Sequence, residues 1–375
     1  MDIGLPKERR PFEFRVGLTP ATVRTLTEQN HRVYVENGAG ESAGFHNDEY
    51  ERAGGIIVYD EEEIYARPDL LAKFSRPMYS ELQMMKEGII LMGFLYLHAT
   101  KRDKIDLIMD KKITSISTEL IYDNNEYPVL GSVTSLAGQL LPPIAFQYLN
   151  NLHDGSGILL GGAPGIPPAD VVIIGCGNAG FEAAKNFLNS GAQVTVLDRD
   201  LNRLKIIHRF LGGGSRIVSM LSTKFSIEKV VKYADVLILA IQTPGKRTPV
   251  LISEEMVKTM KPRSIIIDLS IDQGGCAETS RITNHGSPTF IKHNVIHYCV
   301  PNLSSIVART ASYAYNNALR PYLCSVVNNP LEMIKKDSIL SSGLVTYKGE
   351  IVHPSLKQRV EASASSEKTY FATDN

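Results

Sequence analysis

The sequence lacks the features of a secreted, metal-binding or membrane-spanning protein. Its four cysteines (Cys176, Cys276, Cys299 and Cys324) are scattered and show no spacing typical of a metal site. Isolated thiols of this kind fit a reducing compartment. The first residues do not form a signal peptide, and no apolar run reaches the length of a membrane span. We therefore expect a cytoplasmic protein with no bound metal and no membrane partner.

The sequence also lacks an excess of charge of either sign. Lys and Arg together number 40, and so do Asp and Glu, so the composition gives no indication of a nucleic-acid partner. Internal repeats and heptads are not found, which argues against a solenoid or a coiled coil. The 375 residues are enough for two domains with ample buried cores.

The sequence does contain a glycine motif, which follows a run of β-branched residues. Residues 171–180 read Val-Val-Ile-Ile-Gly-Cys-Gly-Asn-Ala-Gly and lead into a helical pattern, which is the strand–turn–helix context of a dinucleotide fingerprint. Gly175 allows the tight turn, Gly177 lets the backbone approach a pyrophosphate, and Gly180 lets the helix pack close to the strand. The N–H groups at Asn178 and Ala179 would face the phosphates at the helix N-terminus.

An acid follows at the expected distance. Residues 193–197 are predicted to form the second strand, which ends at Asp198, where the ribose 2′-hydroxyl is held in such folds. A carboxylate repels a 2′-phosphate, so the pattern favours NAD over NADP. The alternative is a generic α/β turn with a solvated Asp.

Strands alternate with helices on both sides of this motif, which predicts two α/β domains with parallel, doubly wound sheets. The pattern changes near Ser132, where a long apolar helix over 136–149 is expected to be interrupted by Pro142 and Pro143. Six strands with intervening helices follow, and a helix over 308–324 returns the chain to the first domain. We predict a substrate domain at 1–131 and 304–375, with an NAD-binding domain at 132–303 inserted into it.

Four stretches outside the glycine turn indicate the function. They are Glu13-Phe-Arg-Val-Gly-Leu-Thr-Pro20, Lys73 in Ala-Lys-Phe, Tyr96-Leu-His98-Ala, and Ile267-Asp-Leu-Ser-Ile-Asp272-Gln-Gly-Gly-Cys276. With residues 161–168 and the fingerprint, they closely resemble the alanine dehydrogenase family, which is related to the NAD(H)-binding subunit of proton-translocating transhydrogenase. The resemblance runs from Ile3 to about Pro354.

The resemblance implies roles for individual residues. Arg15 and Lys73 look like substrate-binding residues, and His98 and Asp272 like the catalytic acid–base pair. Cofactor contacts are implied for Thr134, Asp198, Arg203, Asp272 and Asn302. The implied reaction is the NAD-dependent oxidation of L-alanine to pyruvate and ammonium, carried out by a homohexamer.

The residue chemistry is consistent with these roles. Arg15 can bind a carboxylate through two parallel hydrogen bonds, and Lys73 can add a positive point charge beside it. His98 has an ordinary pKa of about 6.5, which suits proton transfer at neutral pH. Asp272 follows a strand of the nucleotide sheet, at the edge where ligands bind.

Each of these residues also has a structural interpretation. Arg15 can be a surface charge before a helix, and Lys73 a solvated lysine at a strand end. His98 can be a buried histidine with satisfied hydrogen bonds, Asp272 a turn cap, and Asn302 a turn residue.

Departures from the family pattern leave the substrate open. After Lys73 the family usually reads Val-Lys-Glu-Pro, whereas this chain reads Phe74-Ser75-Arg76-Pro77, so an acid is replaced by a base. Ser135 stands where the family has a glutamate, and Pro301 precedes Asn302. Two alternatives to alanine dehydrogenation therefore remain. One is an oxidoreductase of the same fold acting on another amino acid or an opine-like imine, and the other is a non-catalytic NAD(H)-binding module.

Overall fold

The structure is a computed structural model that describes residues 1–212, 216–329 and 331–365. The chain divides into two compact units. The first unit comprises Met1–Val133, Pro244–Lys246 and Ser305–Asn375, and the second comprises Thr134–Thr243 and Arg247–Ser304. The last ten residues of the predicted substrate domain, 366–375, lie outside the described residues.

An eight-stranded sheet forms the centre of the first unit, in the order β15-β14-β6-β5-β4-β1-β2-β3. The six strands β1 to β6 are all parallel, and β14 and β15 add an antiparallel edge. Their bounds are β1 (Asp2–Leu5), β2 (Arg32–Glu36), β3 (Ile56–Val58), β4 (Leu70–Ser75), β5 (Ile90–Phe94), β6 (Thr114–Ser117), β14 (Leu344–Tyr347) and β15 (Glu350–Ile351). The parallel strands have the order 3-2-1-4-5-6 of a doubly wound fold, with the direction of winding reversed between β1 and β4.

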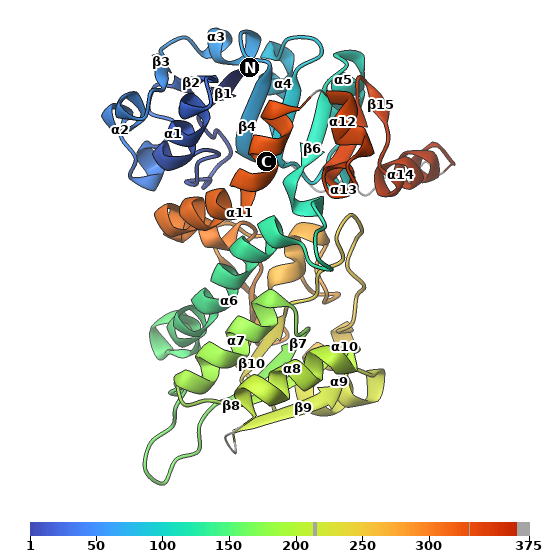
Figure 1. Ribbon diagram of the computed structural model, residues 1–375. Helices are drawn as coiled ribbons and strands as arrows, with labels where there is room; N and C mark the ends of the chain where they lie inside the picture. Colours follow the sequence, from blue (N-terminus) through green and yellow to red (C-terminus); the bar gives the residue numbers. More distant parts are fainter. Residues whose placement is uncertain (213–215, 330, 366–375) are drawn as a thin grey trace. The chain divides into compact units, whose positions relative to one another are not determined.

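Helices cover both faces of this sheet because its strands are apolar on both sides. One core cluster contains Ile3, Phe74 and Leu319, and another contains Leu71, Ile64 and Ile105. The helices of this unit are α1 (Pro20–Glu28), α2 (Asn47–Arg52), α3 (Glu61–Ala66), α4 (Tyr79–Met84), α5 (Arg102–Asp110), α11 (Ala308–Asn328), α12 (Leu331–Lys336), α13 (Leu340–Gly343) and α14 (Pro354–Ser365). Helix α11, orange in Figure 1, therefore belongs to the same unit as the N-terminal strands.

The second unit repeats this topology in a seven-stranded sheet, in the order β12-β13-β11-β10-β7-β8-β9. All strands except β12 are parallel, and the winding reverses between β7 and β10. The strands are β7 (Asp170–Ile174), β8 (Gln193–Asp198), β9 (Ile217–Leu221), β10 (Val236–Leu239), β11 (Ile265–Asp268), β12 (Thr289–Lys292) and β13 (Val295–Tyr298). The prediction of two α/β doubly wound domains is thus confirmed.

Helices α7 (Asn178–Asn189) and α8 (Leu201–Leu211) pack against β7, β8 and β9 (Figure 1). On the opposite face are α9 (Lys224–Val231) and α10 (Glu254–Lys258), whose Ile227 and Val257 belong to a separate core cluster. Strand β12 was not predicted from the sequence. It forms the antiparallel edge, where pairing with a single neighbour weakens the apolar pattern.

Helix α6 (Pro128–Leu149) corrects the expectation of a helix interrupted by prolines. It is not interrupted, because it runs through both Pro142 and Pro143. Leu141, Ala145 and Leu149 recur every four residues and are buried in the core of the second unit, so packing offsets the hydrogen bonds that the prolines cannot make. By length and composition alone α6 could cross a membrane, and 44% of its most apolar window is buried inside the structure.

Candidate functional site

The two predicted substrate-binding residues and the predicted catalytic histidine belong to segments at the carboxyl edge of the first sheet. Arg15 follows β1, Lys73 is in β4, and His98 follows β5, and these three strands are neighbours in the sheet. The winding reverses between β1 and β4, and ligands of open α/β sheets bind at this point. The fold therefore brings the three loops or strand ends to one edge of the first unit.

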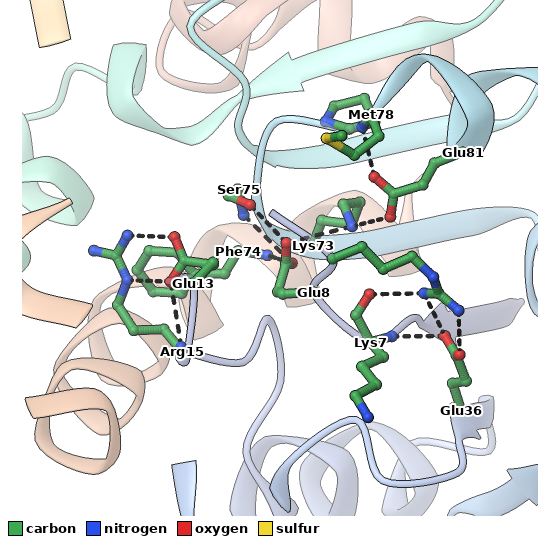
Figure 2. Close-up of polar contacts among 12 residues, drawn as sticks. Lys7, Glu8, Glu13, Arg15, Glu36, Lys73, Phe74, Ser75, Met78 and Glu81 are labelled. Atoms are coloured by element: carbon green, nitrogen blue, oxygen red, sulfur yellow. Dashed lines mark hydrogen bonds and ion pairs between the residues drawn. The ribbon is translucent and has the colours of Figure 1, made fainter. Parts of the chain in front are cut away.

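Lys73 is fully buried and has two carboxylate partners. Its Nζ lies 2.7 Å from Oε1 of Glu81 and 3.3 Å from Oε2 of Glu8, and no part of its side chain is exposed (Figure 2). The two carboxylates raise the pKa of Lys73 against the opposing effect of burial. The amine is therefore charged and already engaged, so the alternative of a solvated lysine is wrong.

Besides its ion pair with Lys73, Glu81 accepts hydrogen bonds from two neutral groups. Its Oε1 accepts from the hydroxyl of Tyr65 at 2.5 Å, and its Oε2 accepts from the backbone N–H of Met78 at 2.5 Å. Lys73 and these donors outweigh burial and lower the pKa of Glu81. Glu81 is thus the ionised partner that keeps the Lys73 amine in place.

Glu8 holds the carboxyl end of β4. Its Oε1 accepts from the backbone N–H of Phe74 at 2.6 Å, and its Oε2 accepts from the hydroxyl of Ser75 at 2.6 Å (Figure 2). Burial raises the pKa of Glu8, with further increases from Glu81 and Glu13 and an opposing decrease from Lys73. This acid connects the loop after β1 to the end of β4.

Arg15 is buried between a carboxylate and an aromatic ring. Its Nε and Nη2 each donate to Glu13 at 2.6 Å, and its guanidinium carbon lies 4.0 Å from the centre of the Phe74 ring. Only 6% of the Arg15 side chain is exposed. The interpretation of Arg15 as a surface charge is therefore wrong.

The loop that carries Arg15 is held by the segment that returns after the second unit. Ser305 accepts from the backbone N–H of Phe14 at 2.9 Å, and Ser312 accepts from that of Val16 at 3.0 Å. Asn316 then accepts from the N–H of Thr19 at 3.0 Å, at the start of α1. The position of Arg15 thus depends on residues about 290 positions later in the sequence.

His98 lies in a different environment from Lys73. Both of its ring nitrogens are buried and have no hydrogen-bond partner among the described residues, so the expected alternative of a satisfied buried histidine does not hold. Burial lowers its pKa to about 4, with further lowering by the nearby cations Arg359 and Arg76 and by His353. The imidazole is therefore neutral at pH 7.

Glu119 was missed by sequence reasoning. It follows β6 and accepts hydrogen bonds from the backbone N–H groups of Leu95 (3.2 Å) and Tyr96 (2.8 Å), directly before His98. Burial raises its pKa to about 7. Glu8 and Glu81 were also missed, because an isolated glutamate carries no local signal for a partner elsewhere in the sequence. No role was predicted for Glu13, although its partner Arg15 is only two residues away.

The glycine motif of the second unit has the geometry that its sequence predicts. Gly175 has a φ of +103°, which favours glycine, and a Cβ there would lie 2.5 Å from the Ala240 carbonyl oxygen. A Cβ on Gly180 would lie 1.8 Å from the Gly175 carbonyl oxygen, so the helix approaches the strand as closely as glycine permits. Gly177 is the N-cap of α7, which begins at Asn178 and continues with Ala179.

Asp198 ends β8 beside this turn. One carboxylate oxygen accepts from the backbone N–H of Cys176 at 2.6 Å, and the other accepts from that of Asp200 at 2.8 Å. Arg203 lies 3.9 Å from the same carboxylate and also close to Gly177. The acid, the arginine and the glycine turn therefore form one surface.

The loop after β11 is held by Asp268, which sequence reasoning also missed. This buried acid accepts from the N–H groups of Ser270 and Cys276 and from the hydroxyl of Ser280. Asp272 lies within the turn that these bonds fix and is exposed. The pKa of Asp268 is raised by burial, and its hydrogen bonds oppose this rise.

Two further predicted residues flank this sheet. Asn302 follows β13 with a φ of 50°, a left-handed conformation that asparagine tolerates. Thr134 lies on α6, half-buried, at the start of the second unit. Among residues 1–212, 216–329 and 331–365, no group of three or more metal-binding side chains is arranged to hold a metal ion.

Comparisons with known proteins show the family of this chain. The sequence matches the profile "Alanine dehydrogenase/PNT, N-terminal domain" at residues 4–137 and "Alanine dehydrogenase/PNT, C-terminal domain" at residues 143–354. It is 40% identical to alanine dehydrogenase 2 of Staphylococcus aureus (strain USA300), covering 96% of this chain and 97% of that relative.

Solved structures show the same relationship. An L-alanine dehydrogenase has a TM-score of 0.89 and 37% identity, covering 96% of this chain and 99% of that one. A transhydrogenase from Sinorhizobium meliloti has a TM-score of 0.78 at 23% identity, covering 94% and 99%, and so shares the fold. The chain therefore belongs to the alanine dehydrogenase/PNT family.

Proposed function

We propose that this protein is an NAD-dependent alanine dehydrogenase. It converts L-alanine, NAD and water to pyruvate, ammonium, NADH and a proton, and it catalyses the reverse reductive amination. The observation that carries this proposal is that one chain of this family combines a glycine turn beside Asp198 with a buried Arg15. A protein that only bound NAD would not need an arginine held for a carboxylate.

The second unit is the part that binds NAD. The N–H groups at the start of α7 receive the pyrophosphate, and Gly177 leaves room for it because a side chain there would occupy that space. Asp198 and Arg203 contact the adenosine ribose, and Thr134 and Asn302 contribute further contacts. When bound, NAD supplies the carbon that accepts the hydride.

The first unit binds the substrate. Arg15 holds the carboxylate of alanine or pyruvate by paired charge-assisted hydrogen bonds. Glu13 binds the edge formed by Nε and Nη2 and so orients the guanidinium. Lys73 contributes positive charge from its buried position and supports the substrate site through Glu8.

Proton transfer is assigned to His98 and Asp272. His98 is neutral at pH 7 because its pKa is lowered to about 4, so it acts as a base when water is added to the oxidised substrate and a proton must leave. The exposed carboxylate of Asp272 orients water or the ammonium group. Oxidation and reduction then use the same groups in opposite directions.

We further propose that the protein is a cytoplasmic homohexamer. All four cysteines are free thiols, which suits a reducing compartment. An open groove of about 380 Å³ on the second unit is lined by Pro142, Pro143, Phe146, Leu159, Leu160, Gly161 and Ser190. Phe146 is 48% exposed and Leu159 is 57% exposed, and a second copy of the chain would cover such apolar area.

The proposed activity is tested by NADH absorbance with ammonium and a panel of 2-oxo acids. We expect NADH oxidation with pyruvate and ammonium at the highest kcat/KM of the panel. Turnover with another 2-oxo acid or amine while pyruvate and ammonium are inert would indicate a different amino acid or an opine-like product. Tight NADH binding without turnover on any of them would indicate a binding module.

A further inference from the structure

We propose that Phe74 is a positioning residue for Arg15, and that its ring, together with Glu13, fixes the orientation in which the guanidinium meets the substrate carboxylate. This inference rests on the proposed function, in which Arg15 binds the carboxylate of pyruvate or alanine. It assigns a role to a side chain that does not itself carry charge or exchange protons.

The side chains of Arg15 and Phe74 are in close contact and are shielded from solvent. The guanidinium carbon of Arg15 lies 4.0 Å from the centre of the Phe74 ring, with Phe74 fully buried and Arg15 only 6% exposed. A guanidinium stacks well on an aromatic face because it is planar and weakly hydrated. The attraction between cation and ring increases when water is excluded.

Ring and carboxylate constrain Arg15 in complementary ways. The ring covers one face of the guanidinium, whereas Glu13 binds the edge formed by Nε and Nη2 (Figure 2). Together they determine the plane of the guanidinium and its rotation within that plane. A long, flexible side chain is thereby ordered before the substrate arrives, which lowers the entropic cost of binding.

Phe74 is itself held from three directions. Its ring centre lies 4.5 Å from that of Tyr315 and 5.3 Å from that of Phe94. Its backbone N–H donates to Glu8 at 2.6 Å, and Glu8 is paired with Lys73. The buried ion cluster therefore acts on Arg15 through the position of this ring.

The test compares Phe74→Leu with Phe45→Leu. Both substitutions remove a buried ring of the same core that lies against an arginine, but the ring of Phe74 faces Arg15, whereas that of Phe45 faces Arg309. We expect Phe74→Leu to raise the KM for pyruvate by about tenfold or more, as loss of a buried cation–ring contact implies. The kcat at saturating pyruvate and the Kd for NADH should change by less than roughly threefold, because Arg15 acts on the bound carboxylate in ground and transition states alike.

Phe45→Leu should leave the KM for pyruvate within about threefold of wild type, while lowering thermal stability about as much as Phe74→Leu does. Equal rises in KM for the two variants, or an unchanged KM for Phe74→Leu, would overturn the inference. If Phe74→Leu does not fold, Glu13→Gln serves instead, and it should raise the KM by about tenfold because one charged hydrogen bond is lost. An inactive wild type would instead refute the proposed function.

Discussion

The amine of Lys73 lies 2.7 Å from Oε1 of Glu81, and neither side chain is exposed to solvent. A second carboxylate, that of Glu8, lies 3.3 Å from the same amine. One cation thus compensates two acids in a place that water does not reach. The lysine that sequence reasoning assigned to the substrate is therefore also a main electrostatic support of the first unit.

Replacement of Lys73 by methionine should lower the free energy of unfolding by about 3–5 kcal/mol, because Glu8 and Glu81 would stay buried without their cation. Lys112→Met is the matched control, since Lys112 pairs with Glu87 at the surface of the same unit and such pairs contribute about 0–1 kcal/mol. Denaturant unfolding of both variants measures the difference. If Lys73→Met and Lys112→Met lose similar amounts of unfolding free energy, the buried cluster does not stabilise the fold.

His98→Ala should reduce kcat by about 10²–10⁴-fold and leave NADH binding intact, as expected for loss of a general base. Because the pKa of His98 is lowered to about 4, the group is already deprotonated at neutral pH. The kcat/KM for alanine oxidation should therefore show no titration of His98 near pH 6.5, and its acid limb should lie near pH 4. Unchanged turnover in His98→Ala would exclude this residue as the base.

Ionisation of Glu119 should lower the free energy of unfolding as the pH rises from about 4.5 to 7. Its pKa is raised from 4.5 to about 7 in the folded protein, so the folded state binds the proton more tightly and loses this advantage as the proton leaves. The loss is about 3 kcal/mol across that interval. Tyr315 is the titratable neighbour that faces it, and this tyrosine stays protonated throughout the interval because burial raises its pKa.

Glu119→Gln tests this dependence, because glutamine does not titrate. Thermal midpoints of wild type and variant across pH 4.5–7 should converge or cross as Glu119 ionises in the wild type. A parallel pair of curves would show that Glu119 does not titrate in this range.

Asp198→Ala should lower kcat/KM for NAD by about 10–100-fold, since charged hydrogen bonds to the ribose are worth roughly 1.5–3 kcal/mol. The value for NADP should change less or rise, because repulsion of the 2′-phosphate is removed. Asp170→Asn, at the opposite end of the neighbouring strand β7, is the control and should leave the NAD/NADP ratio unaltered. If Asp198→Ala has the same NAD/NADP ratio as wild type, Asp198 does not select between the two cofactors.

Local patterns predicted the cofactor side of the fold well. The β-branched run, the glycines and Asp198 are adjacent in sequence and space, so spacing alone gave the turn, the helix and the acid. The continuous course of α6 was not predictable in this way. Local rules stop a helix at Pro142, whereas burial of Leu141, Ala145 and Leu149 in the core keeps it helical.

The substrate side was predictable only in part. The resemblance predicted substrate-binding roles for Arg15 and Lys73, which stay predictions, and the surroundings of these residues depend on partners up to about 300 residues away. Glu8 reaches Lys73 and Phe74 from the loop after β1, and Ser305 and Ser312 fix the Arg15 loop from a segment about 290 residues later. No periodicity or motif records such contacts.

The anchoring of the Arg15 loop by α11 has a consequence for biosynthesis. The acceptors for the N–H groups of Phe14, Val16 and Thr19 are Ser305, Ser312 and Asn316, which leave the ribosome only after the whole second unit has been translated. A nascent chain that ends before Ser305 can pair its parallel strands, but its Arg15 loop has none of these anchors. The Arg15 loop can therefore be fully anchored only after the chain has been synthesised through Asn316.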